Sequence, residues 1–246
     1  MGFRCIFKTN FKNQYIKIIP VSEYSGITSP AEGTPRQSLN LGLYLVYFYF
    51  WMIKINEKVS NMEITRLEPT KKKGLIVVIT GYGKGKTTTA LGIVVRACGH
   101  NMRTSIIQFM KGDIYAGEWD GIKKMDCNVE LISTGKGFCG IKGNPYPFEE
   151  HRENAQDAIK LTHHKMKSGQ WDILILDEIN NALHLRLADL EQVLEIIRNK
   201  PPEMHLVLTG RDAHPQVVEL ADTVSEVLEV KHAYQKDIEP QPGIDY

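Results

Sequence analysis

The chain of 246 residues is poor in cysteine, and none of its cysteines forms a C-x-x-C pair. The four are scattered along the sequence as Cys5, Cys98, Cys127 and Cys139. Zinc knuckles and disulfide frameworks need closely spaced or regularly paired cysteines, so this pattern argues against both and suits a reducing compartment. We therefore expect each cysteine to be buried or incidental.

The chain also lacks an excess of charge of either sign. Its formal net charge is +1 and its pI is about 7.7. A dedicated nucleic-acid binder usually carries a basic face. We therefore expect no nucleic-acid partner.

No apolar run in the sequence reaches the length of a membrane span. Residues 41–53 form an uncharged run of thirteen residues, whereas a membrane-spanning helix needs about 20. The run lies far from the N-terminus for a secretory signal, and no small-residue cleavage site follows it. The sequence therefore predicts no membrane-spanning segment.

Residues 1–61 differ in composition from the rest of the chain. Residues 1–40 are rich in Gly, Pro, Ser, Thr and Asn without a sustained period, so we expect little fixed structure there. Three interpretations stay open: a segment that binds a membrane surface or a partner, an N-terminal lid, or translated sequence ahead of the true start at Met52 or Met62. We divide the chain into an atypical extension, 1–61, which is disordered or not part of the native protein, and a domain, 62–246.

The stretch from Leu75 to Gly92 is typical of a phosphate-binding P-loop. A branched apolar strand leads into a glycine-rich loop that ends in Gly-Lys-Thr, and a helix follows. Lys86 is expected to reach phosphate oxygens and the Thr87 hydroxyl to bind Mg²⁺, while backbone N–H groups surround the anion. The usual first glycine is replaced by Thr80. The predicted nucleotide-binding residues are Gly81, Tyr82, Gly83, Lys84, Gly85, Lys86, Thr87 and Thr88.

A second motif is a hydrophobic strand that ends in Asp177-Glu178. Such a strand places carboxylates near a P-loop, where they can hold Mg²⁺ directly or through water. We therefore predict a metal site made of Thr87, Asp177 and Glu178. A further strand ends at Arg211, which can pair with phosphate or, alternatively, form a surface salt bridge.

Strand and helix patterns alternate along the domain, which predicts an α/β fold. Further strands are expected at 104–110, 129–132 and 223–230, and helices at 148–167, 190–197 and 217–221. The long loop 133–147 is typical of a functional lid. We predict a P-loop NTPase-like, RecA-like fold: a mostly parallel sheet with helices on both faces. The crevice at the strands' carboxyl ends would collect the P-loop, Asp113, Glu118, Asp177, Glu178 and Arg211.

Several stretches together resemble one family, the P-loop ATP:corrinoid adenosyltransferases, also called cob(I)yrinic acid a,c-diamide or cob(I)alamin adenosyltransferases. The resemblance extends over about residues 74–246, so that residues 62–246 are expected to form the adenosyltransferase domain. The matching stretches are 80–87, 108–112 with Gly117-Glu118, 176–180, 209–211, 220–226, 230–233 and the closing 243–246.

The resemblance implies an activity and a set of partners. The family transfers the 5′-deoxyadenosyl group of ATP to the cobalt(I) of a reduced corrinoid and releases triphosphate, in adenosylcobalamin biosynthesis or salvage. It implies Mg²⁺ or Mn²⁺ as the cation, a catalytic set of Lys86, Thr87 and Glu178, and Phe138 in the loop against the corrinoid. It also implies a cytoplasmic homodimer and a reducing flavoprotein partner.

Three other functions are compatible with a P-loop. They are hydrolysis of a nucleotide by a motor-like ATPase or GTPase, a regulatory protein that only binds nucleotide, and a small-molecule kinase. A guanine-reading Asn-Lys-x-Asp motif is not present in the sequence. The phosphate-containing products separate these possibilities.

Overall fold

The computed structural model describes residues 5–9, 16–20, 48, 49, 51, 53, 68–112, 115–137, 139–140 and 144–246. The chain divides into two compact units, Met1–Leu67 and Glu68–Tyr246. In the first unit, strand β1 (Cys5–Thr9) pairs antiparallel with β2 (Ile16–Pro20). The sequence did not predict this pair, because two isolated five-residue strands are too short to give a clear periodic pattern. The predicted start of the domain at Met62 lies outside the described residues.

The second unit is built on a six-stranded sheet in the order β5-β4-β6-β7-β3-β8. Every neighbouring pair of strands in this sheet runs parallel. The predicted α/β P-loop fold with a parallel sheet is therefore confirmed. The strands are β3 (Ile76–Thr80), β4 (Thr104–Gln108), β5 (Val129–Ser133), β6 (Ile173–Asp177), β7 (His205–Thr209) and β8 (Thr223–Glu226).

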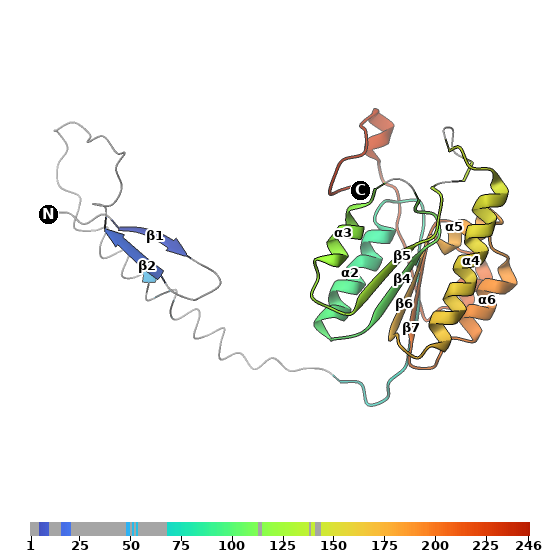
Figure 1. The fold of residues 1–246 in the computed structure, drawn as a ribbon, viewed down its shortest axis with the longest axis horizontal. Coiled ribbons are helices and arrows are strands. Elements are labelled where there is room, and N and C mark those ends of the chain that lie inside the picture. Colours follow the sequence, from blue (N-terminus) through green and yellow to red (C-terminus); the bar gives the residue numbers. More distant parts are fainter. Residues whose placement is uncertain are drawn as a thin grey trace. The chain divides into compact units, whose positions relative to one another are not determined.

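Helices cover both faces of the sheet, as the sequence predicts (Figure 1). Helices α2 and α3 lie on one face, and α4, α5 and α6 lie on the other. The predicted helix over residues 148–167 is confirmed at both ends. The helices are α2 (Lys86–Gly99), α3 (Gly117–Lys123), α4 (Phe148–Lys167), α5 (Ile179–His184), α6 (Leu190–Arg198), α7 (Pro215–Leu220) and the 3₁₀ helix η2 (Ala233–Lys236).

Two hydrophobic cores result from the alternation of side chains along the strands. In β6, Ile173 and Ile175 pack in the core under α2 and α3, whereas Leu174 and Leu176 pack in the core under α4–α7. All four are buried. Because both faces of β6 are covered, this strand is apolar on both sides until it reaches Asp177, as expected for a central strand of a parallel sheet.

Strand β8 ends at Glu226, earlier than the predicted 230. The reason is the glycine loop after β3: the Gly83 N–H donates to the Val227 carbonyl at 2.7 Å, and the Val227 N–H donates to the Thr80 carbonyl at 2.8 Å. The chain beyond Glu226 therefore follows the loop instead of continuing along the sheet.

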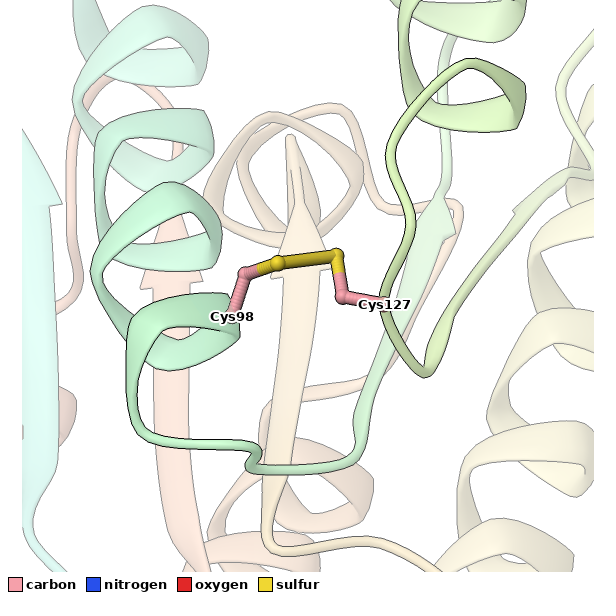
Figure 2. Close-up of a disulfide and its surroundings, with 2 residues drawn as sticks. All are labelled: Cys98 and Cys127. Atoms are coloured by element: carbon pink, nitrogen blue, oxygen red, sulfur yellow. A yellow bond between two sulfur atoms is a disulfide. The ribbon is translucent and has the colours of Figure 1, made fainter. Parts of the chain in front are cut away.

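A disulfide joins Cys98 to Cys127, with their Cα atoms 5.5 Å apart (Figure 2). This corrects the expectation that each cysteine is buried or incidental. Cys98 lies near the end of α2 and Cys127 just before β5, and they are 29 residues apart in sequence. Only the fold brings them together, so their spacing in the sequence gives no sign of the bond. Cys139 is a free cysteine and is partly exposed.

Among the described residues, no helix has both the length and the apolar character that crossing a membrane requires.

Candidate nucleotide-binding site

The glycine loop lies at the carboxyl end of β3, between that strand and α2. Gly81 and Gly85 have positive φ angles of 95° and 116°, which favour glycine. A Cβ atom on Gly83 would lie 2.6 Å from the Leu228 carbonyl oxygen, so no larger residue fits there. Thr80, which replaces the usual first glycine, is the last residue of β3, and its hydroxyl oxygen accepts a hydrogen bond from the Ala213 N–H at 3.1 Å.

Lys86 begins α2 and its ammonium group is held inside the loop. Its Nζ donates to the Gly83 carbonyl oxygen at 2.8 Å, and the side chain is buried. Burial lowers the pKa of Lys86, while the nearby carboxylate of Glu178 opposes that effect. A cation kept close to the loop backbone is well placed to exchange a carbonyl oxygen for a phosphate oxygen.

Asp177 ends β6 and is almost completely buried. Its Oδ1 accepts hydrogen bonds from the Thr87 hydroxyl at 3.0 Å and the Thr209 hydroxyl at 2.7 Å. Its Oδ2 accepts from Gln108 Nε2 at 3.2 Å. Burial raises the pKa of Asp177, and these three hydrogen bonds act against it. The aspartate is thus fixed by groups from α2, β7 and β4.

Glu178 follows in a left-handed backbone conformation, with φ 65°. A non-glycine residue seldom adopts this conformation, and such strain is often found at functional sites. The Glu178 N–H donates to the Thr209 hydroxyl oxygen at 2.9 Å. Burial, and then the charge of Asp177, raise the pKa of Glu178 to about 7. Its Oε2 atom is buried without a hydrogen-bond partner among the described residues.

The donor set fits a cation that arrives with a nucleotide. Within the described part of the chain, no cluster of three or more His, Cys, Asp or Glu side chains could hold a metal ion by itself. Mg²⁺ is typically bound by one or two carboxylates, with phosphate oxygens and water completing its shell. The Thr87 hydroxyl and the unpartnered oxygen of Glu178 suit that arrangement.

A pocket of about 560 Å³ opens above the loop. Its lining includes all of the predicted nucleotide-binding residues from Tyr82 to Thr88, together with Glu178 and Arg211. Gly81 and Asp177 do not line it, although Asp177 contacts Thr87. Phe138 and Asp113 lie outside the described residues. The structure thus brings most of the predicted site together around one cavity.

Arg211 lies beside Tyr82 at the edge of the pocket. Its guanidinium carbon is 5.6 Å from the centre of the Tyr82 ring, whose hydroxyl donates to Asp212 at 2.7 Å. The backbone N–H of Arg211 donates to the Asn181 side-chain oxygen at 2.5 Å. Arg211 makes no ion pair with another described residue, so its charge is available to a ligand in the pocket.

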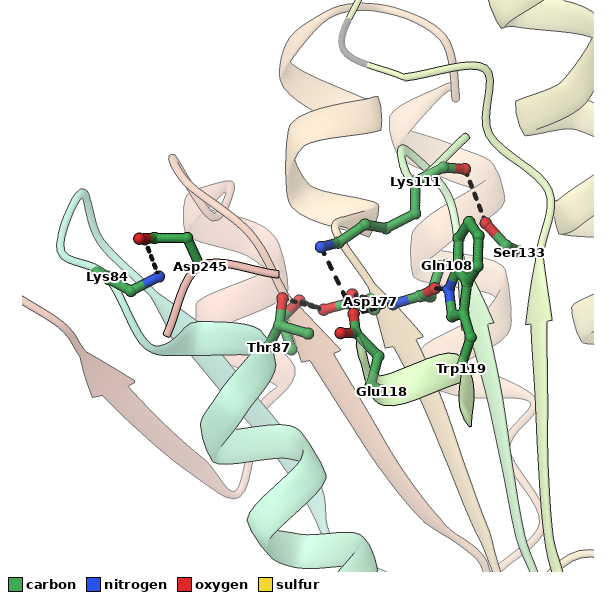
Figure 3. A network of polar contacts seen from close by, with 10 residues as sticks. Lys84, Thr87, Gln108, Lys111, Glu118, Trp119, Ser133, Asp177 and Asp245 are labelled. Atoms are coloured by element: carbon green, nitrogen blue, oxygen red, sulfur yellow. Dashed lines mark hydrogen bonds and ion pairs between the residues drawn. The ribbon is translucent and has the colours of Figure 1, made fainter. Parts of the chain in front are cut away.

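The C-terminal tail, residues 243–246, lines the same pocket. Asp245 Oδ1 is 2.7 Å from Lys84 Nζ (Figure 3). The Gly243 N–H donates to the carbonyl oxygen of Tyr246 at 2.7 Å, which curls the tail. The tail therefore packs through polar contacts with the glycine loop, which hydrophobicity does not reveal.

Residues at the end of β4 and after it form a further polar group beside the pocket (Figure 3). Lys111 Nζ is 3.5 Å from Glu118 Oε1, and both residues line the pocket. Gln108 and Trp119 complete the group. The sequence predicted that Glu118 lies at the carboxyl edge of the sheet. It did not predict the contacts with Gln108 and Trp119.

A glycine loop after a central parallel strand, a lysine and threonine at the start of the next helix, and a buried aspartate ending another strand define a P-loop nucleotide-binding protein. Comparison with known families then identifies the chain more closely. The family model described as "ATP:corrinoid adenosyltransferase BtuR/CobO/CobP" matches residues 72–246. The chain belongs to this family, as its resemblance predicted.

Relatives with known names agree with this assignment. The chain is 34% identical over 175 residues to a corrinoid adenosyltransferase of Pseudomonas aeruginosa. The aligned region covers 71% of this chain and 85% of the relative. It is 33% identical over 175 residues to the corrinoid adenosyltransferase of Escherichia coli K12, and this alignment covers 71% of this chain and 87% of the relative. It is 32% identical over 196 residues to corrinoid adenosyltransferase CobA of Salmonella typhimurium, covering 77% and 95%.

Among solved structures, a KaiC-like protein from Pyrococcus horikoshii aligns with 65% of this chain and 76% of its own, at 15% identity and a TM-score of 0.38. The parallel sheet and the glycine loop define the fold by themselves.

Proposed function

We propose that the protein transfers the 5′-deoxyadenosyl group of ATP to the cobalt(I) of a reduced corrinoid and releases triphosphate, in the biosynthesis or salvage of adenosylcobalamin. The observation that carries this proposal is the family match, because it extends over the whole sheet, both cores and every described residue of the pocket. The substrates are accordingly ATP and a corrinoid.

The reaction needs no nucleophile from the protein. Cobalt(I) supplies the electron pair for the bond to C5′ of the ribose, and the electrons of the C5′–O bond leave with the triphosphate. The protein has to position the two substrates and stabilise the leaving anion. Lys84, Lys86 and the loop N–H groups are suited to that task, with ATP lying in the loop in the opposite sense from ordinary NTPases.

A divalent cation, Mg²⁺ or Mn²⁺, would neutralise part of the triphosphate charge when bound. Thr87, Asp177 and Glu178 would hold it, the last through the carboxylate oxygen that has no hydrogen-bond partner in the described part of the chain. We assign catalytic roles to Lys86, Thr87 and Glu178. Each of them lines the pocket.

The remaining proposals rest on the family resemblance. The corrinoid would lie over the ATP, against the loop that contains Phe138. The protein would act as a cytoplasmic homodimer, and a reducing flavoprotein would supply cobalt(I). Residues 62–246 would form the working domain, with 1–61 as an extension.

The first experiment is an anaerobic assay of the purified protein with ATP, Mg²⁺ and chemically reduced cobalamin or cobinamide. We expect loss of the cobalt(I) absorbance together with a stoichiometric amount of triphosphate. ADP and phosphate without any change at cobalt would instead indicate hydrolysis. ADP with a phosphorylated product would indicate a kinase, and no product at all would indicate a protein that only binds nucleotide.

A further inference from the structure

We propose that Gln108 is a positioning residue for the cation site, and that the indole N–H of Trp119 fixes the orientation of its amide. Gln108 would hold the carboxylate of Asp177, one of the three residues proposed to bind the nucleotide-bound cation, and would link it to Glu118 in the pocket. This inference rests on the proposed function, since it concerns the same site.

The position of Gln108 follows from the register of the sheet. Gln108 ends β4 and Asp177 ends β6, and the two residues are paired in adjacent parallel strands. The Gln108 side chain is completely buried. Its Nε2 lies 3.2 Å from Asp177 Oδ2 and 3.2 Å from Glu118 Oε1. One amide nitrogen thus donates to two carboxylates, one buried and one in the pocket (Figure 3).

Trp119 determines the orientation of the Gln108 side-chain amide. Its indole Nε1 is 2.9 Å from Gln108 Oε1. An indole nitrogen can only donate a hydrogen bond, so the atom that it meets must be the amide oxygen. The amide nitrogen then has to face the two carboxylates. Tyr115 packs edge-on against Trp119, with ring centres 6.2 Å apart, and this contact helps to hold the indole in place.

The amide completes the set of donors around Asp177. Thr87 and Thr209 both donate to Oδ1, which leaves Oδ2 to Gln108. Without the amide, Oδ2 would be a buried acceptor with no donor among the residues that the structure describes, and Asp177 and Glu118 would lose the group that links them. Such outer partners of metal ligands orient the ligands, and their loss typically reduces metal affinity by about 10–100-fold.

The test compares ATP binding with and without a divalent cation in the full-length protein, in the absence of corrinoid so that no turnover occurs. For Gln108→Met, which keeps the length of the side chain but removes both donors, we expect about tenfold weaker ATP binding in the presence of Mg²⁺. Binding without metal should stay within about twofold of wild type. Mn²⁺ titrated into the protein–ATP complex and followed by electron paramagnetic resonance should show the same loss of affinity.

Trp119→Phe provides a milder variant in case Gln108→Met does not fold. It removes one hydrogen bond to a neutral group, so we expect about fivefold weaker metal-dependent binding. Trp171→Phe is the matched control, because the Trp171 indole N–H is buried without a partner among the described residues. That variant should bind Mn²⁺ and ATP as wild type does.

The outcomes separate this inference from the proposed function. Equal losses with and without metal, or metal-dependent binding unchanged in both Gln108→Met and Trp119→Phe, would overturn the role of Gln108. A wild-type protein whose ATP affinity ignores Mg²⁺ would overturn the cation site together with this inference. Metal-dependent binding that is lost in the variants, in a protein that fails to adenosylate corrinoids, would support Gln108 and contradict only the proposed function.

Discussion

Lys86 is the residue whose charge the proposed reaction uses most directly. In the structure its ammonium group donates to the Gly83 carbonyl, so it is already held where a phosphate would replace that oxygen. We predict that Lys86→Ala lowers the rate of adenosyl transfer by about 10²–10³-fold, because a buried cation no longer stabilises the leaving triphosphate. Single-turnover measurements under anaerobic conditions would test this. Lys160→Ala, at an exposed position paired with Asp157, is the control and should leave the rate unchanged.

Glu178 should make the stability of the metal-free protein depend on pH. Its pKa rises from 4.5 to about 7 on folding, so the folded state favours the protonated form. The protein is then most stable below pH 4.5 as far as this group is concerned, and it loses stability as the pH rises towards 7. The loss amounts to at most about 3–4 kcal/mol, because one pKa unit corresponds to about 1.4 kcal/mol.

Glu178→Gln tests this directly. The variant should be more stable than wild type to urea at pH 8 and similar to it at pH 4.5, since glutamine carries no charge to bury. A difference between the two proteins that stays the same at both pH values would contradict the raised pKa. Mg²⁺ with ATP should reduce the advantage of the variant at pH 8, because a bound cation compensates the buried charge.

At the scale of single elements, the C-terminal tail places a carboxylate inside a pocket suited to an anion. Asp245 pairs with Lys84, and both side chains are partly exposed. We predict that Asp245→Asn tightens ATP binding by up to about fivefold, because Lys84 no longer has a competing anion, and changes stability by less than about 1 kcal/mol. Weaker binding in this variant would mean that Asp245 contacts the nucleotide. Asp157→Asn, at an exposed position on α4, is the control, because it removes the same charge and should leave ATP binding unchanged.

The elements that the sequence predicts best are those with a long, clear pattern. Helix α4 has Ala155, Ile159, Thr162 and Met166 on one face, and all four are buried. The strands before the glycine loop and before Asp177 were equally plain, because both are apolar and end in functional residues. Helices α3 and α5 are only seven and six residues long, so they carry too few turns to show a period.

The parts of the site that were not predicted depend on contacts between distant segments. The link from Trp119 through Gln108 to Asp177 requires that β4 and β6 be neighbours in a given register. The pair of Lys84 and Asp245 joins two ends of the domain. Neither contact leaves a trace in local composition or spacing, whereas the P-loop is a local motif and was therefore visible.

For the whole molecule, we predict that a chain beginning at Met62 folds and works as well as the full chain. The unit Glu68–Tyr246 contains the six-stranded sheet and the pocket, and the family match begins at residue 72. Thermal unfolding and the adenosyl-transfer rate of the two chains should agree. Loss of activity in the shorter chain would show that the first sixty-one residues take part in the reaction.

The place of β3 in the sheet also determines when, during synthesis of the chain, the glycine loop can take its folded form. Its neighbours are β7 and β8, the last two strands of the chain, and the Leu228 carbonyl that packs against Gly83 comes later still. Domains form as the ribosome delivers the chain from its N-terminus. The glycine loop therefore leaves the ribosome long before the strands that support it. A nascent chain that stops short of His205 should not retain ATP, and the nucleotide can act as a ligand only for the finished protein.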